Sequence, residues 1–328
     1  MGAVRSVLAA PALICLIVAA CGGGPVPPTP TPLPTPTATA GPRSAPSPPV
    51  AILDPSMTAG ELFDDDLPAG DLNLVERSRE TRETAVVRDV SFSGADGQPV
   101  PAFLVVPASG TTRGAVLFLH WLGDDFSSRD EFVDEAVELA GEGIESMLIT
   151  QHFPWAERPL GVDHDRVAIG LQVRTIRRAL TVLARDAGNV HLALVGHDYG
   201  AMYAILVASV DPRVAALAAM TPDATWVNWF VQYFHVVAQG DAAGYAQAMA
   251  DLDPVTRIAS VKAPVLLQFG TADTYVSGEV ATAIANAAPG GTLLHRYDVG
   301  HRLNGPARDD RDAWLLRELG VHVPTRSP

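Results

Sequence analysis

Short apolar segments alternate with longer segments of helical periodicity, and this alternation constrains the fold more than any other feature. The apolar segments are residues 115–120, 144–150, 190–196, 214–222, 264–273 and 291–301. The segments of helical pattern are residues 127–143, 164–186, 199–209, 276–288 and 308–320. A strand that is apolar throughout has both of its faces buried. The alternation therefore predicts an α/β fold whose central, mostly parallel sheet carries helices on both faces.

An antiparallel hairpin precedes the alternating region. Residues 83–107 contain two strand-like segments around Asp96-Gly97, a dipeptide typical of tight hairpin turns. With this hairpin as its antiparallel N-terminal edge, the sheet should contain about eight strands. Residues 51–80 are expected to form a loosely packed lead-in, in which the consecutive aspartates Asp64, Asp65 and Asp66 are solvated.

Residues 223–262 interrupt the alternation with one or two helices and a cluster of aromatic residues. An insert at this point lies at one end of the sheet and predicts a short helical lid. Aromatic side chains in such an insert either pack in the core or line a pocket, and we expect some of them to do each. The candidate pocket residues, including two that follow other strands, are His120, Trp155, Trp226, Trp229, Tyr233 and Tyr245.

The N-terminus has the pattern of an exported lipoprotein. Arg5 precedes an apolar stretch that is short for a membrane span and fits the hydrophobic region of a secretory signal. The stretch ends in Val18-Ala19-Ala20-Cys21, which resembles a bacterial lipobox with Cys21 as the lipidated residue. The alternative interpretation is an ordinary signal peptide with a chance cysteine.

A lipidated Cys21 would anchor the protein to a bacterial membrane on its extracytoplasmic side. The expected segments are a signal peptide over residues 1–20, a lipidated cysteine with a Pro/Thr-rich extended linker over 21–50, and a folded domain over 51–328. The chain contains two cysteines, Cys15 and Cys21. The mature domain is therefore expected to contain neither a disulfide nor a thiol nucleophile.

The charge and the histidine spacing limit the classes of ligand. A formal net charge of −14 argues against binding to nucleic acids. The histidines outside the motifs below do not show metal-ligand spacing, so we predict no metal site and no cofactor. The expected partners are a small-molecule substrate and, through Cys21, the membrane.

The segment LALVGHDYGAMY contains a strand, a sharp turn and the start of a helix, with the turn at Gly196-His197-Asp198-Tyr199-Gly200. In a G-x-nucleophile-x-G turn, the central side chain projects over the sheet, and flanking glycines let strand and helix approach closely. The backbone N–H of the next residue, Tyr199, faces charge that develops near the nucleophile. The pattern therefore predicts Asp198 as a nucleophile.

Two further residues occupy the matching positions after later strands. Asp273 ends the segment 264–273, and His301 ends the segment 291–301. The carboxyl ends of parallel strands meet at one edge of the sheet, where open α/β sheets bind ligands. We therefore expect Asp273 to orient His301 and His301 to act as a base beside Asp198.

The segment LFLHWLGD supplies the last expected part of the site. It follows the strand 115–120 and contains His120-Trp121-Leu122-Gly123. A backbone N–H from Trp121 or Leu122 would complete an oxyanion hole with the N–H of Tyr199.

Together these motifs resemble the α/β-hydrolase family over roughly residues 84–320. The short insert and the ending YDVGHRLN resemble the dienelactone-hydrolase-like and acyl-peptidase-like branches, which use Cys or Ser as the nucleophile. The elbow GHDYG instead resembles the epoxide hydrolases and dehalogenases of this fold, which use Asp. This resemblance implies that Asp198, Asp273 and His301 act as nucleophile, orienting acid and base.

An aspartate nucleophile suits displacement at saturated carbon, because acylation of a carboxylate would give an anhydride. Asp198 would attack a C–O or C–halogen bond to form an alkyl ester, and His301 would activate the water that hydrolyses it. Tyr233 and Tyr245 are candidates for protonating an epoxide oxygen. The absence of Trp after Asp198 favours an epoxide or other strained ether over a halide.

Two alternatives remain open at this point. The protein could be a catalytically silent member of the fold that binds a ligand or partner, since Asp tolerates the strained turn well. It could also be a dienelactone-hydrolase-like esterase in which Asp198 serves as a base for direct attack by water.

Overall fold

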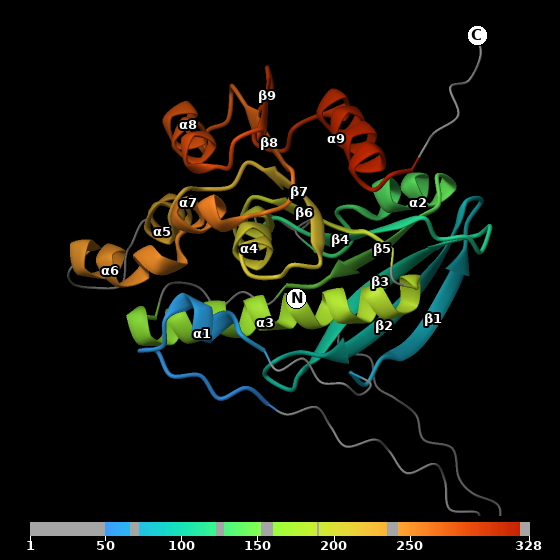
Figure 1. The fold of residues 1–328 in the computed structure, drawn as a ribbon, viewed down its shortest axis with the longest axis horizontal. Coiled ribbons are helices and arrows are strands. Elements are labelled where there is room, and N and C mark those ends of the chain that lie inside the picture. Colours follow the sequence, from blue (N-terminus) through green and yellow to red (C-terminus); the bar gives the residue numbers. More distant parts are fainter. Residues whose placement is uncertain are drawn as a thin grey trace, which may run out of the picture. The chain divides into compact units, whose positions relative to one another are not determined.

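A sheet of nine strands forms the centre of the protein in our computed structural model, in the order β1-β2-β3-β5-β4-β6-β7-β8-β9 (Figure 1). The first three strands and the β3–β5 pair are antiparallel, and the remaining pairs are parallel. The strands are β1 (Val75–Thr81), β2 (Ala85–Ser93), β3 (Pro99–Pro107), β4 (Gly114–Leu119), β5 (Ile144–Ile149), β6 (Leu192–His197), β7 (Val214–Met220), β8 (Val265–Gly270) and β9 (Leu293–Tyr297).

The structure describes residues 50–65, 72–122, 128–151, 160–188, 190–234 and 242–321, without the side chains of residues 231–234. The expected signal peptide, Cys21 and the linker lie outside these residues, as does Trp155. Within the described residues, we find no helix that combines the length and the apolar character needed to span a membrane.

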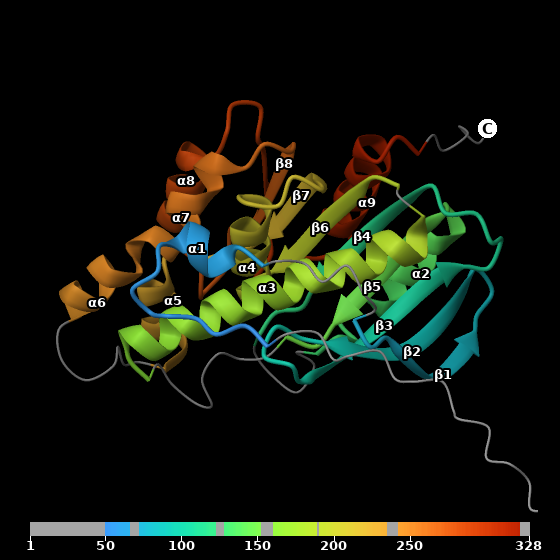
Figure 2. The same cartoon turned by 60° about the horizontal axis from the view of Figure 1, so that its bottom comes forward.

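Helices cover both faces of the sheet, as the alternation predicted (Figures 1 and 2). Helices α2 and α9 pack on one face, and α1, α3, α4 and α8 pack on the other. The helices are α1 (Ala59–Phe63), α2 (Val133–Gly141), α3 (Val162–Ala187), α4 (Tyr199–Ala208), α5 (Trp226–Phe234), α6 (Ala242–Met249), α7 (Pro254–Arg257), α8 (Gly278–Ala287) and α9 (Gly305–Glu318).

The central strands are buried along their whole length, which explains their unbroken apolar sequences. Every residue of β4, β5 and β6 is buried. Side chains that alternate along these strands enter two separate cores, one beneath α3 and α4 and one beneath α2 and α9. The predicted fold class is therefore confirmed.

The N-terminal lead-in differs from our expectation of a loosely packed segment. Strand β1 adds a ninth strand at the antiparallel edge, and most of its residues are exposed. Helix α1 begins with a capping box between Thr58 and Glu61, and its Leu62 and Phe63 are fully buried against α3. The segment is thus an integral part of the core.

The acidic run is also not uniformly solvated. The Asp65 carboxylate accepts two hydrogen bonds from the guanidinium of Arg178, at 2.8 and 3.1 Å. Both side chains are buried, and Arg178 also donates to the carbonyl of Gly94. The neighbouring Asp64 is exposed, as expected. The ion pair thus joins the α1 segment to the middle of α3.

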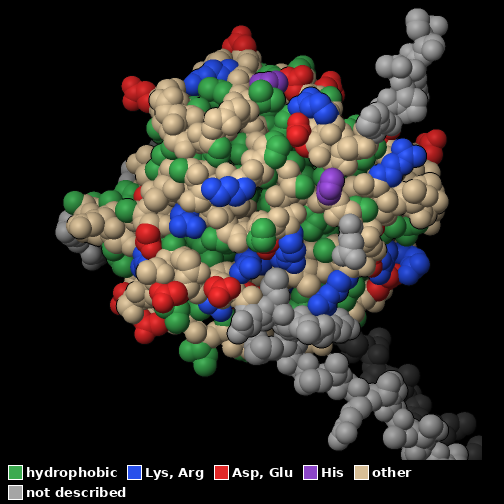
Figure 3. Space-filling model, in the orientation of Figure 1, with side chains coloured by type: hydrophobic (Ala, Val, Ile, Leu, Met, Phe, Trp, Pro, Cys, Tyr) green, Lys and Arg blue, Asp and Glu red, His purple; other side chains and the backbone are tan. Residues whose placement is uncertain are grey.

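The insert between β7 and β8 contains α5, α6 and α7 within the described residues. Acidic and basic side chains are interspersed over the face shown in Figure 3, so the net charge is not gathered into one acidic patch there.

We predict that Asp65→Ala lowers the free energy of unfolding by about 3–5 kcal/mol, because it leaves the buried Arg178 charge without its carboxylate. Asp64→Ala is the matched control: its side chain is 80% exposed and 3.9 Å from Arg177, so its loss should change stability little. Urea denaturation of both variants measures the difference. Equal stability of the two variants would contradict the structural role of Asp65.

Candidate active site

The turn between β6 and α4 forms a sharp elbow with Asp198 at its tip. Asp198 has φ 50° and ψ −114°, a conformation that side chains other than glycine rarely adopt. A Cβ at Gly196 would lie 2.4 Å from the carbonyl oxygen of Gly200. A Cβ at Gly200 would lie 2.2 Å from the carbonyl oxygen of Leu119. Strand, helix and the neighbouring β4 thus approach too closely for any other residue at the two glycines.

The carboxylate of Asp198 is fully buried, and hydrogen-bond donors face both of its oxygens. The backbone N–H of Leu122 donates to Oδ2 at 3.4 Å, and the indole Nε1–H of Trp229 donates to Oδ1 at 3.2 Å. Nε2 of His301 lies 3.6 Å from Oδ1. One oxygen therefore faces the loop after β4, and the other faces His301 and the insert.

Asp273 holds the other side of the His301 ring. Its Oδ2 lies 2.8 Å from Nδ1 of His301, and its Oδ1 accepts from the backbone N–H groups of Tyr275 and Val276. A cavity of about 390 Å³ reaches His301, with Tyr275 and Trp121 among its walls. The structure therefore brings together Asp198, Asp273 and His301 at one edge of the sheet, as the order of the motifs predicted.

The two carboxylates control the charge of His301. Burial lowers the pKa of this imidazole, but the hydrogen bonds and charges of Asp198 and Asp273 outweigh burial and raise it to about 9. Burial raises the pKa of Asp273, whereas His301 and the two backbone N–H groups lower it more, so the net shift is downward. At neutral pH the resting site therefore contains an imidazolium between two carboxylates.

The expected oxyanion hole needs one correction. The backbone N–H of Trp121 donates to Oε2 of Glu131 at 2.8 Å, so it does not face the site. Of the two candidates in this loop, Leu122 supplies the N–H at Asp198. Tyr199 is the first residue of α4, and its buried ring packs against Tyr203 and Trp229. The role of its N–H remains a prediction.

His120 anchors the loop instead of lining a pocket. Its Nδ1 lies 2.7 Å from the carbonyl oxygen of Trp121, and its Nε2 accepts from the backbone N–H of Gln151. Burial lowers the pKa of the buried His120 ring, which favours the neutral form with its proton on Nδ1. Nδ1 thus bonds within the loop after β4, and Nε2 joins that loop to the residues that follow β5.

The aromatic residues of the insert have separate roles. Trp229 contacts Asp198, but Trp226 is fully buried and donates its indole N–H to the carbonyl of Leu252. Tyr245 donates its hydroxyl to Asp165 at 2.6 Å. Tyr233 lies in α5, and its side chain is outside the described residues. Of the predicted pocket residues, the structure thus places Trp229 at Asp198 and assigns Trp226 and Tyr245 other hydrogen bonds.

Glu131 was not expected in the site. It follows the loop after β4, just before α2, and contacts both Trp121 and His197. An acidic residue near the start of a helix is ordinarily attributed to the helix dipole, so its sequence position gives no signal of this role.

Comparisons with known proteins agree with this geometry at the level of the fold. No family model matches the chain, and no curated protein matches its sequence. Acetyl xylan esterase 1 from Thermoanaerobacterium sp. JW/SL YS485 superposes with a TM-score of 0.64 and 14% identity, over 81% of this chain and 92% of that one.

Two other solved structures have the same architecture. A cold-adapted esterase from an Arctic intertidal metagenomic library gives a TM-score of 0.55 at 18% identity, covering 75% of this chain and 99% of its own. The 2,6-dihydroxy-pseudo-oxynicotine hydrolase gives 0.54 at 18% identity, covering 76% and 70%. The strand order, the elbow and these similarities agree: the chain has the α/β-hydrolase fold, with an aspartate at the tip of its strand-to-helix elbow.

Proposed function

We propose that the protein is a hydrolase that uses Asp198 as a nucleophile at saturated carbon and forms an alkyl ester on that residue. The observation that carries the proposal is the placement of the two Asp198 oxygens. Oδ1 faces Trp229 and His301, whereas Oδ2 accepts the N–H of Leu122. If Asp198 were retained only because it tolerates the turn conformation, its two oxygens would not need different sets of partners.

The two oxygens suit the two half-reactions. In the first, Oδ1 attacks the substrate carbon, and the leaving group departs with the bonding electron pair. In the second, water adds to Cγ of the ester, and Oδ2 becomes the oxyanion, which the N–H of Leu122 stabilises. The Cγ–Oδ1 bond then breaks, and the alkoxy group leaves as an alcohol after taking the proton that His301 removed from water. The Asp198 carboxylate is restored with one oxygen from that water.

The charge of His301 changes between these steps. In the resting site its pKa of about 9 keeps it protonated at neutral pH. Esterification of Asp198 removes one of the two negative charges that raise this pKa. The pKa therefore falls when the ester forms, and the neutral imidazole can then take a proton from water. The base becomes active after the intermediate has formed.

Trp229 bears on the substrate class. Its indole N–H stabilises a departing anion by hydrogen bonding but does not release a proton. An epoxide oxygen needs a proton donor, and of the two candidate tyrosines the one whose side chain is described, Tyr245, donates its hydroxyl to Asp165. We therefore place alkyl halides first and epoxides second, which reverses the preference drawn from the sequence.

Ester hydrolysis is the second candidate, and the similarity to solved esterases favours it. A carboxylate nucleophile would form an anhydride with an ester substrate, so this route needs direct attack by water. The base for that attack would be Asp198, whose oxygens already accept hydrogen bonds from Trp229 and Leu122, or His301, which is protonated at neutral pH in the resting site. The geometry therefore supports the alkyl-ester route better.

We also propose that the domain is exported and held at a membrane by lipid on Cys21. The support is the sequence Val18-Ala19-Ala20-Cys21 after an apolar stretch, followed by the Pro/Thr-rich segment 22–50.

We predict that His301→Gln traps the intermediate. The first half-reaction needs no base, so the peptide that contains Asp198 should gain the butyl group when the variant is incubated with 1-bromobutane. In a parallel incubation with styrene oxide, the same peptide should gain the mass of the whole epoxide. Turnover should fall by roughly 10²–10⁴-fold, as expected for loss of a general base. Mass spectrometry of the digested protein measures the adduct.

Asp198→Ala is the control, and it should abolish both adduct and turnover. A His301→Gln variant that hydrolyses an ester at the wild-type rate without gaining mass would contradict the proposal. Wild-type protein that neither forms an adduct nor turns over any probe would identify a silent member of the fold.

The pH dependence separates the two candidate routes. In the alkyl-ester route, hydrolysis of the adduct should reach half its maximal rate well below pH 9, because the neutralised Asp198 no longer raises the pKa of His301. In a direct-water route with His301 as the base, the rate of turnover should keep rising to about pH 9, the pKa in the resting site. Rapid-quench measurement of adduct decay, together with the rate of product release, against pH distinguishes the two routes.

For the location, we predict that Cys21→Ser moves the protein from the membrane fraction to the soluble fraction, because the lipid attachment site is lost. Cys15→Ser is the matched control and should remain with the membranes. Fractionation followed by immunoblotting measures the distribution, and a Cys21→Ser variant that stays as firmly bound as wild type would show that Cys21 is not the anchor.

A further inference from the structure

A second histidine–carboxylate pair lies directly beside the catalytic groups. His197 precedes Asp198 in the elbow, and its ring stacks on the rings of Trp121 and His301, with both centroid distances at 5.4 Å. The rings of Trp121 and His301 also contact each other, with centroids 5.9 Å apart. Nδ1 of His197 lies 2.5 Å from Oε1 of Glu131. The His197 residue itself is buried, with 2% of its surface exposed.

The pair connects the three segments that carry the site. Oε2 of Glu131 accepts the backbone N–H of Trp121, one residue before the donor at Asp198. Nε2 of His197 lies 3.1 Å from the backbone carbonyl oxygen of His301. The pair thus joins the loop after β4, the elbow and the loop that carries His301.

The hydrogen-bond partners fix the protons of this pair. The carbonyl oxygen of His301 can only accept, so Nε2 of His197 must carry a proton. Without a further proton between Nδ1 and Glu131, a nitrogen lone pair would face a carboxylate oxygen at 2.5 Å, which is repulsive. The geometry therefore places one proton on Nε2 of His197 and one between Nδ1 and Oε1 of Glu131.

We propose that Glu131 and His197 are positioning residues for the reaction at Asp198. Glu131 fixes Trp121 and thereby holds the N–H of the adjacent Leu122 at Oδ2, and His197 holds the backbone of His301. The kinetic part of this inference rests on the proposed function. It assigns to Glu131 a role in the second half-reaction, where the oxyanion forms.

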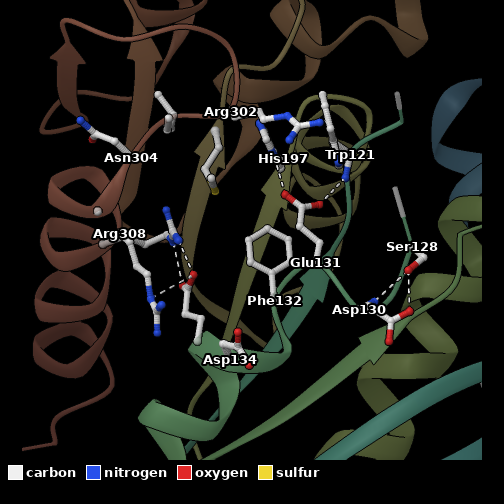
Figure 4. Close-up of a pocket in the computed structure, with 15 residues that line it drawn as sticks. Trp121, Ser128, Asp130, Glu131, Phe132, Asp134, His197, Arg302, Asn304 and Arg308 are labelled. Carbon is white, nitrogen blue, oxygen red and sulfur yellow. Dashed lines mark hydrogen bonds and ion pairs between the residues drawn. The ribbon is translucent and has the colours of Figure 1, made fainter. Parts of the chain in front are cut away.

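A large cavity gives access to this pair. It has a volume of about 730 Å³, and its walls include Glu131, His197, Phe132 and Met220. Figure 4 shows Glu131 in this cavity, with contacts to His197 on one side and Trp121 on the other. The Glu131 side chain is 16% exposed. A small carboxylate can therefore diffuse to the place that Glu131 occupies.

Glu131→Ala tests the role, with Asp134→Ala as the matched control. Asp134 lies in α2 and lines the same cavity, but its side chain is 91% exposed and contacts neither active-site loop. Glu131→Ala should slow decay of the Asp198 adduct by roughly 10–100-fold, less than the loss of an oxyanion donor itself. Formation of the adduct should change by less than about 3-fold, because no oxyanion forms in that step.

Formate provides a positive test. At constant ionic strength, sodium formate should restore a substantial part of adduct decay in Glu131→Ala and leave Asp134→Ala unchanged. Sodium chloride should have no such effect. Equal slowing of both half-reactions, or an absence of rescue by formate, would overturn the positioning role.

A substrate-free measurement separates this inference from the proposed function. In ¹⁵N-labelled wild type, His197 should show protons on both ring nitrogens, assigned by their loss in His197→Gln. The Nδ1 proton signal should disappear in Glu131→Ala and persist in Asp134→Ala. A wild-type His197 with one ring proton would overturn the pairing, whereas failure to trap any adduct in His301→Gln would overturn only the proposed reaction.

Discussion

The close approach of three backbone segments is the constraint on which the site depends. β4, β6 and the start of α4 meet where Gly196 and Gly200 leave no room for a Cβ. This contact forces the residue between them into a left-handed conformation and directs its side chain away from the core. Asp198 therefore occupies a position set by the fold, and the chemistry follows from what surrounds it.

Charge is the second organising element. Asp198, His301 and Asp273 form one row of alternating charge, and Glu131 with His197 forms another beside it. The carboxylates of Asp273 and Glu131 accept backbone N–H groups, which fix their positions. In the proposed reaction Asp198 is the one of these carboxylates that loses its charge, so the pKa of His301 responds to the progress of catalysis.

Much of this arrangement could be predicted from the sequence, because it depends on strand ends. Asp198, Asp273 and His301 each follow a strand of the parallel part of the sheet, and this position in the sequence predicts that they meet at one edge. Unbroken apolar segments likewise predicted strands that are buried on both faces. Each of these signals lies in a short segment of the chain. The parallel arrangement of the strands then brings the ends of those segments close together.

The parts that were missed depend on contacts between distant segments. Strand β1 is mostly exposed and charged, so its sequence lacks the alternation of a half-buried strand. Asp64 and Asp65 are neighbouring aspartates, and the sequence does not indicate which of them is buried. Only the position of Arg178 in α3 distinguishes Asp65, whose carboxylate it binds. The indole of Trp229 reaches Asp198 because of the path that the backbone of the insert follows. The aromatic content of the insert does not specify that path.

The most direct test of the account follows a single turnover in H₂¹⁸O with enzyme in excess over an alkyl halide. If Asp198 forms an alkyl ester, the alcohol released in the first turnover carries unlabelled oxygen from Asp198, and the peptide containing Asp198 acquires ¹⁸O from water. If the alcohol instead carries ¹⁸O while Asp198 remains unlabelled, water attacks the substrate directly, and the role of Asp198 as a nucleophile is contradicted.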